Sequence, residues 1–360
     1  MDDLPAIPRK GRGAIGNPTG RFETAEREAF DDGWGSLEEE PGPLVTTFAD
    51  DATRSIITRN ESPDISFDRS INPYRGCEHG CIYCFARPGH SYLGLSAGLD
   101  FETRIFVKEE APKLLAAELR KRSYTCRTIA IGTNTDPYQP VERKLKIMRR
   151  ILEVLRDFEH PVGIVTKSAL VQRDIDILAP MAEKRLARVA ISLTTLDRKL
   201  ARTMEPRAAS PERRLETIRT LSEAGIPTSV MTAPMIPALN DAELEQLLEA
   251  AVAHGASGAG YVLLRLPHEV KDLFREWLDT HWPDKAEHVM SLLRQAHGGK
   301  AYESSWGTRM TGVGPYAEML RLRFQKACQR LGIERRGNDW KLDTTRFRPP
   351  PQSGDQLRLF

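Results

Sequence analysis

The sequence lacks a long hydrophobic run. Its uninterrupted apolar stretches, such as residues 261–264 (YVLL), are far shorter than the roughly 20 residues that cross a bilayer as a helix. The first residues (MDDLPAIPRKGRG) contain no apolar segment of the kind that directs secretion. We therefore expect a cytoplasmic protein with no membrane partner.

The sequence also has little net charge and few cysteines. Its 52 Lys and Arg residues and 50 Asp and Glu residues give a formal net charge of +2, which indicates no polyanionic partner for the chain as a whole. Five cysteines is an odd number, which excludes a scaffold of paired disulfides, and three of them lie close together. This usage favours a metal or redox site in a reducing compartment. At 360 residues, with 40% hydrophobic and 28% charged residues, the chain has the composition of a globular protein that buries a full core.

The first 60 residues show little periodicity. Basic residues among glycines and prolines are followed by the acidic residues 38–40 and by a Pro-Gly-Pro sequence. Because such a composition is typical of irregular structure, we predict an irregular N-terminal leader over residues 1–60.

Residues 61–268 show short apolar runs that alternate with amphipathic helical patterns. The runs recur at about the length of one βα unit, which predicts an α/β fold with a parallel sheet. Both candidate architectures, an open doubly wound sheet and a partial (βα)6 TIM-like barrel, place their sites at the carboxyl ends of the strands. The predicted strands are 67–72, 128–131, 162–166, 189–193, 229–233 and 261–266.

Helices are predicted between the strands. One starts at Ser210 as N-cap, with proline next, and stops at Gly225; another starts with a capping-box pattern at Asn240 and Glu243 and stops at residue 255. The others are 112–122, 141–158 and 171–185. Helical patterns at 268–277, 285–296 and 315–331 predict a C-terminal helical extension over residues 269–345, packed on the barrel. Residues 346–360 are predicted to form a flexible, disordered tail.

A loop of three cysteines follows the first predicted strand. Cys77, Cys81 and Cys84 have the spacing C-x3-C-x2-C. Such a loop can place three thiolates on three irons of a cubane cluster and leave the fourth iron open. The alternative is zinc with His79 as the fourth ligand, but the second cysteine pair typical of zinc ribbons is absent from the sequence. The spacing therefore favours an iron–sulfur cluster.

This loop, with Tyr83 before its last cysteine and a series of six βα units, resembles the radical S-adenosylmethionine (SAM) superfamily. The resemblance implies a partial (βα)6 barrel and a [4Fe–4S] cluster on Cys77, Cys81 and Cys84 whose open iron is chelated by SAM. Reduction of SAM would then give methionine and a 5′-deoxyadenosyl radical that abstracts a hydrogen atom from the substrate. A reductant such as flavodoxin or ferredoxin is also implied.

Five further stretches resemble the spore photoproduct lyase branch of this superfamily: 132–140 (GTNTDPYQP), 165–168 (VTKS), 190–193 (AISL), 205–207 (EPR) and 233–236 (APMI). The resemblance implies that SAM is contacted by Tyr83, Thr135, Lys167 and Ser192. Weaker candidates for substrate contact are Asp136, Tyr138, Arg265 and His268.

Two positions depart from that branch. The lyase has a cysteine that returns a hydrogen atom to the product radical, and the matching residue here is Thr133, whose O–H bond is a poor hydrogen-atom donor. The lyase also has a tyrosine directly after the last cluster cysteine, and here that residue is Phe85. We therefore expect a relative with a different substrate, and the sequence assigns no catalytic residue beyond the cofactor ligands.

The C-terminal residues 356–360 (QLRLF) resemble the pentapeptide by which bacterial replication and repair proteins dock on the DNA sliding clamp. Gln356, Leu357, Leu359 and Phe360 would contact the clamp; the alternative is a segment folded back onto its own core.

The leading hypothesis is a radical SAM enzyme that acts on DNA or a DNA lesion in repair. The alternatives are a radical SAM enzyme that modifies RNA or protein, and a non-catalytic Fe–S redox sensor tethered to the clamp.

Overall fold

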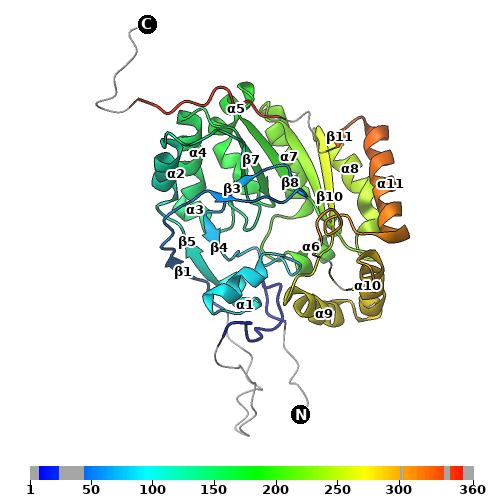
Figure 1. Ribbon diagram of the computed structural model, residues 1–360. Helices are drawn as coiled ribbons and strands as arrows, with labels where there is room; N and C mark the ends of the chain where they lie inside the picture. Colours follow the sequence, from blue (N-terminus) through cyan, green and yellow to red (C-terminus); the bar gives the residue numbers. More distant parts are fainter. Residues whose placement is uncertain (1–7, 24–43, 301, 303, 336–340, 352–360) are drawn as a thin grey trace.

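The computed structural model describes residues 8–23, 44–300, 302, 304–335 and 341–351 (Figure 1). Its main sheet has the strand order β11-β10-β9-β8-β7-β6-β3-β2, and neighbouring strands from β3 to β11 are parallel. Six of these strands follow one another in chain order, with helical segments between them, as a partial (βα)6 barrel requires. They are β3 (Arg69–Ile71), β6 (Ile129–Ile131), β7 (Val162–Thr166), β8 (Ala187–Ser192), β9 (Thr228–Met235) and β10 (Gly258–Leu263).

Edge strands flank this series without closing it. β2 (Thr58–Arg59) pairs antiparallel with β3, and β11 (Glu334–Arg335) pairs with β10. Among the described residues, no pairing joins β2 to β11. The sheet is therefore an open barrel with one lateral gap.

Alternation along the strands separates two faces of the sheet. Ile129, Val162 and Val189 are completely buried in the core that the sheet shares with its helices. A hollow of about 40 Å³ on the inner face is lined by the small residues Ala130, Gly163 and Ala190, and also by larger ones such as Ile164 and Arg188. Closed barrels usually fill this space with bulky branched side chains, and here small residues alongside Arg188 leave a narrow space inside the barrel.

Helices cover the outer face of the sheet (Figure 1). The predicted helix over 141–158 is wrong in one respect: it is divided into α3 (Glu142–Leu145) and α4 (Ile147–Asp157) by Lys146, which has a φ of 51°. The predicted helix over 171–185 begins as the 3-10 helix η2 (Ala169–Asp174) and continues as α5. The other covering helices are α2 (Ala111–Leu119), α5 (Ile175–Glu183), α7 (Pro211–Glu223), α8 (Leu244–Ala253) and α11 (Gly314–Leu331).

One of the two predicted caps is confirmed. The Ser210 hydroxyl accepts a hydrogen bond from the Arg213 amide at the start of α7. The Asn240 capping box is wrong, because the Asn240 amide group bonds the backbone of Ile236, Thr194 and Pro234 instead. Buried backbone groups of neighbouring loops thus outcompete the local helix start for this side chain.

Several elements around the cysteine loop were not predicted. A small second sheet has the order β1-β5-β4, and a 3-10 helix, η1 (Arg87–Leu93), follows the cysteines. The remaining elements are β1 (Thr47–Asp50), β4 (Tyr74–Arg75), α1 (Leu99–Thr103), β5 (Arg104–Val107), α6 (Arg198–Met204), the 3-10 helix η3 (Asp241–Glu243), α9 (Val270–His281) and α10 (Pro283–Ala296). α9, α10 and α11 correspond to the predicted C-terminal helices. None of the described helices is both long and apolar enough to cross a membrane.

Two irregular segments pack onto the barrel. In residues 8–23, Ala14 and Ile15 are buried. In residues 341–351, the Phe347 ring packs against Tyr124, Phe158 and His160. Residues 8–23 of the predicted leader are therefore irregular but packed, whereas its later part contains β1 and β2, which the prediction of an irregular segment did not include. Residues 346–351 of the predicted tail are docked. The clamp-like pentapeptide, residues 356–360, lies outside the described residues.

Candidate active site

The three cysteines lie between β4 and η1. Cys77 and Cys81 are buried, Cys84 is half-buried, and none of them forms a disulfide. Two turns shape the loop: the Gly80 amide donates to the Cys77 carbonyl and the Cys84 amide to the Cys81 carbonyl, each at 3.2 Å. At Gly80, φ is +66°, and a Cβ would lie 2.6 Å from the Glu102 carboxylate. This position therefore requires glycine.

Burial controls the ionisation of the thiols. It raises the pKa of Cys77 well above its usual range and the pKa of Cys81 to about 12, although the Lys167 charge opposes the shift at Cys81. Both groups are thus neutral thiols near neutral pH in the metal-free chain. A metal centre that binds them must displace their protons.

His79 faces a carboxylate. Its Nδ1 lies 3.4 Å from Asp136 Oδ2, and Asp136 also accepts from the Lys167 amide at 2.8 Å and the Thr166 hydroxyl at 2.7 Å. Burial alone would raise the pKa of Asp136, but His79 and these donors hold it at about 2. In the part of the chain that the structure describes, no three His, Cys, Asp or Glu side chains are arranged to hold a single metal ion. Three thiols with His79 engaged elsewhere fit a cluster with an open iron.

A buried ion pair supports the cysteine loop through hydrogen bonds to the loop's backbone. Arg87 is fully buried and donates to the carbonyls of Cys81 at 2.9 Å and Gly80 at 3.1 Å, and it pairs with Glu102. Glu102 also accepts from the amides of Gly13 at 3.1 Å and Ala14 at 2.9 Å. We call Arg87, Glu102, Gly13 and Ala14 the loop brace. It joins the N-terminal segment to the cysteine loop.

A second buried network connects the loop to the barrel. The Tyr83 hydroxyl bonds Glu205, which pairs with Arg214. Arg214 donates to the Ser192 carbonyl at 3.0 Å. Burial would raise the pKa of Glu205, but Arg214, Lys167 and Tyr83 outweigh it and lower the pKa. The Lys167 ammonium lies 5.6 Å from the centre of the Tyr83 ring.

The residues predicted to contact SAM lie at the carboxyl ends of strands or in the cysteine loop. Tyr83, Lys167 and Ser192 share the network just described. The Ser192 hydroxyl donates to the Ala233 carbonyl at 3.3 Å, and the Thr135 hydroxyl donates to the Tyr74 carbonyl at 2.9 Å. Thr133 lines the inner hollow. The structure thus groups the first three, and their contact with SAM stays a prediction.

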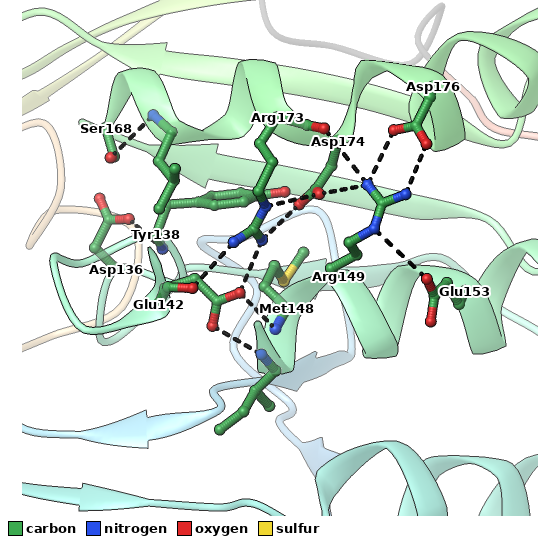
Figure 2. Close-up of polar contacts among 12 residues, drawn as sticks. Asp136, Tyr138, Glu142, Met148, Arg149, Glu153, Ser168, Arg173, Asp174 and Asp176 are labelled. Carbon is green, nitrogen blue, oxygen red and sulfur yellow. Dashed lines mark hydrogen bonds and ion pairs between the residues drawn. The ribbon is translucent and has the colours of Figure 1, made fainter. Parts of the chain in front are cut away.

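A polar network holds the loop that carries Asp136 (Figure 2). Tyr138 is fully buried, with the Arg173 guanidinium 5.9 Å from its ring centre. Arg173 bonds Glu142 at 2.8 Å and Asp174 at 2.9 Å. Asp136 and Tyr138 are therefore engaged in supporting the loop, and their contact with substrate remains a prediction. Of the other two substrate candidates, Arg265 lies against Phe85 and His268 is exposed with a φ of 51°.

Comparison with known proteins decides the family. The sequence profile of the Radical SAM superfamily matches residues 71–251, half of the chain. The chain belongs to the radical SAM superfamily. This match covers the cysteine loop, β6 to β9 and the residues that connect them.

The chain is also similar to uncharacterised relatives and to solved structures. An uncharacterised protein of Mycobacterium tuberculosis is 38% identical over 233 residues, which are 64% of this chain and 68% of that protein. An uncharacterised protein of Methanocaldococcus jannaschii is 31% identical over 173 residues, 48% of this chain and 62% of that protein. Spore photoproduct lyase complexed with dinucleoside spore photoproduct matches 80% of both chains with a TM-score of 0.58 and 15% identity. At that identity, the likeness shows a shared fold.

Sequence reasoning missed the loop brace. Arg87 and Glu102 are fully buried, whereas charged residues are usually exposed, and Gly13 lies far from them in the sequence. A single sequence carries no signal for such a pairing. The Glu205–Arg207 stretch was identified, but its role as partner of Tyr83 and Arg214 was not.

Proposed function

We propose that this radical SAM enzyme carries a [4Fe–4S] cluster on Cys77, Cys81 and Cys84 and binds SAM at the open iron. The observation that carries the proposal is the set of three disulfide-free thiols on a braced loop beside the carboxyl ends of the barrel strands. When bound, the cluster and SAM supply one-electron chemistry that yields a 5′-deoxyadenosyl radical. The chain itself binds, orients and shields these groups.

The hydroxyl groups suit the methionine end of SAM. Because the Ser192 and Thr135 hydroxyls already donate to backbone carbonyls, their remaining lone pairs can only accept. The amino group of SAM, whose lone pair would bind the open iron, would retain only N–H donors and is the matching partner. The Lys167 ammonium supplies the opposite charge for the carboxylate of the same moiety.

The inner hollow is the proposed substrate chamber. Small side chains in its lining, among them Ala130 and Gly163, leave a narrow space in the barrel, and Thr133 also lies in this lining. Because Thr133 has no thiol hydrogen to give, we infer that the product radical is not quenched by this residue, unlike in a lyase with cysteine at this position.

We propose DNA or a DNA lesion as the substrate class, in a repair-associated role. The fold is that of a spore photoproduct lyase crystallised with a dinucleoside photoproduct. A groove of about 1090 Å³ beside α6 and the start of α7 is lined by Arg198, Lys199 and Arg202, which match a phosphate backbone in charge. The clamp-like pentapeptide predicts recruitment to DNA, and flavodoxin or ferredoxin is the proposed reductant.

The substrate class is tested with the reconstituted, SAM-loaded enzyme. We expect 5′-deoxyadenosine formation to rise when damaged DNA is added, and to rise less with RNA or protein fractions. A rise with RNA or protein alone would transfer the proposal to those substrates. SAM cleavage absent from a fully loaded enzyme would favour the redox sensor.

A further inference from the structure

Arg265 lies over an aromatic ring beside the cysteine loop. Its guanidinium carbon is 4.0 Å from the centre of the Phe85 ring. Phe85 directly follows Cys84 and is 38% exposed, and Arg265 follows the end of β10 at Leu263. The pair therefore stands at the barrel mouth, between the cysteine loop and the last strand of the βα series.

No anion contacts Arg265 directly among the described residues, although Asp64, which pairs with Arg309, and the Cys84 thiol interact with its charge at longer range. Its side chain makes no hydrogen bond or ion pair there, although burial is sufficient to lower its pKa. The neighbouring cation Arg309 also lowers it, and that arginine is itself bonded to Asp64 and Ser62, each at 2.5 Å. A partly desolvated guanidinium next to a second cation is costly, and a cation–π contact offsets only part of that cost. Because its N–H groups have no hydrogen-bond partner among the described residues, Arg265 can donate them to an anionic ligand.

We propose that Arg265, held on Phe85, is a phosphate subsite for the DNA substrate. This inference rests on the proposed function. The ring lies on one side of the guanidinium, and its N–H groups can donate to a phosphodiester, which accepts two parallel hydrogen bonds. This platform needs the ring of Phe85 and not a hydroxyl, so it tolerates phenylalanine at a position where the lyase branch has tyrosine.

Binding of a short single-stranded oligodeoxynucleotide to the full chain, measured over a series of salt concentrations, tests the proposal. Arg265→Gln is expected to bind about tenfold more weakly or worse, with the salt dependence reduced by about one phosphate contact. Phe85→Leu should weaken binding and Phe85→Tyr should retain it. The matched control is Arg219→Gln, which removes the same charge from an exposed pair with Glu216 on α7.

Each outcome has one meaning. If Arg265→Gln and Arg219→Gln bind DNA equally well, the subsite is overturned and the proposed function stands. If Arg265→Gln alters the electron paramagnetic resonance signal of the reduced cluster but not DNA binding, Arg265 serves the cluster and the subsite is again overturned. If the wild-type chain binds no DNA at low salt, the proposed substrate class itself fails.

Discussion

Glu102 is the buried anion on which the cysteine loop rests. It neutralises Arg87 and accepts the amides of Gly13 and Ala14, and neither member of the ion pair is exposed. A buried charge whose partner is removed strongly destabilises the folded chain, because it has lost both water and its counter-charge. The integrity of the loop should therefore depend on this one carboxylate.

Glu102→Gln is predicted to reduce the free energy of unfolding by about 3 kcal/mol and to lower the iron and sulfide retained after reconstitution, because Arg87 is left as an uncompensated buried charge. Denaturant titration and metal analysis measure the two effects. Glu110→Gln is the control, since its pair with Lys113 is exposed and should contribute less than 1 kcal/mol. Equal loss in both variants would contradict the brace.

His160 predicts a pH dependence of stability at a site distant from the cysteines in sequence. Burial, assisted by the Arg69 charge, lowers its pKa from 6.5 to about 4, although the Pro161 carbonyl opposes the shift. Below pH 6.5 the unfolded chain takes up a proton that the folded imidazole does not. Stability from this group is therefore complete above pH 6.5 and is lost as the pH falls towards 4.

Between pH 7 and pH 5 the free energy of unfolding of the wild-type chain should fall by about 2 kcal/mol more than that of His160→Gln. Urea unfolding at the two pH values measures it. Tyr124→Phe removes the hydroxyl 2.7 Å from His160 Nε2 but keeps the imidazole, so it should retain most of the pH dependence. A His160→Gln variant with the wild-type pH dependence would refute this account.

At the scale of elements, the segment of residues 8–23 acts as a structural part of the cysteine loop. Gly13 approaches the loop so closely that a Cβ would lie 1.8 Å from the Gly80 carbonyl oxygen. Because the atoms that this Cβ would meet belong to the backbone of the cysteine loop, no flexible side chain can move to make room for it. The contact between the segment and the loop thus depends on the absence of a side chain.

Gly13→Ala is predicted to destabilise the chain by about 1–3 kcal/mol through overpacking and to release the segment from the loop. Limited proteolysis within residues 8–23 reports the release, and reconstitution reports the effect on cluster retention. Gly89→Ala is the matched control, since a Cβ there meets nothing within 4 Å. Proteolysis of the two variants at the same rate would argue against a docked segment.

At the scale of the whole molecule, much of the barrel follows from local patterns. The run 162–166 coincides with β7 because it is rich in β-branched residues and its buried positions alternate with half-buried ones. Ser210 likewise caps α7 as its local sequence predicts, through its own hydroxyl. The small sheet and the contact of Asn240 with Thr194 were not predictable, because they join segments distant in sequence, and the break at Lys146 was also missed. The cysteine spacing identified the loop, whereas the pairing of Glu102 with Arg87 and Gly13 required the folded chain.

The central claim is that the cysteine loop supports radical SAM chemistry. The most direct test is anaerobic reconstitution with iron and sulfide, reduction with dithionite in the presence of SAM, and chromatographic assay of 5′-deoxyadenosine. The wild-type chain and Cys126→Ala, a cysteine outside the loop, are predicted to form it, and Cys81→Ala is predicted to form none. The claim is contradicted by a wild-type chain with a complete cluster that forms no 5′-deoxyadenosine, or by undiminished formation in Cys81→Ala.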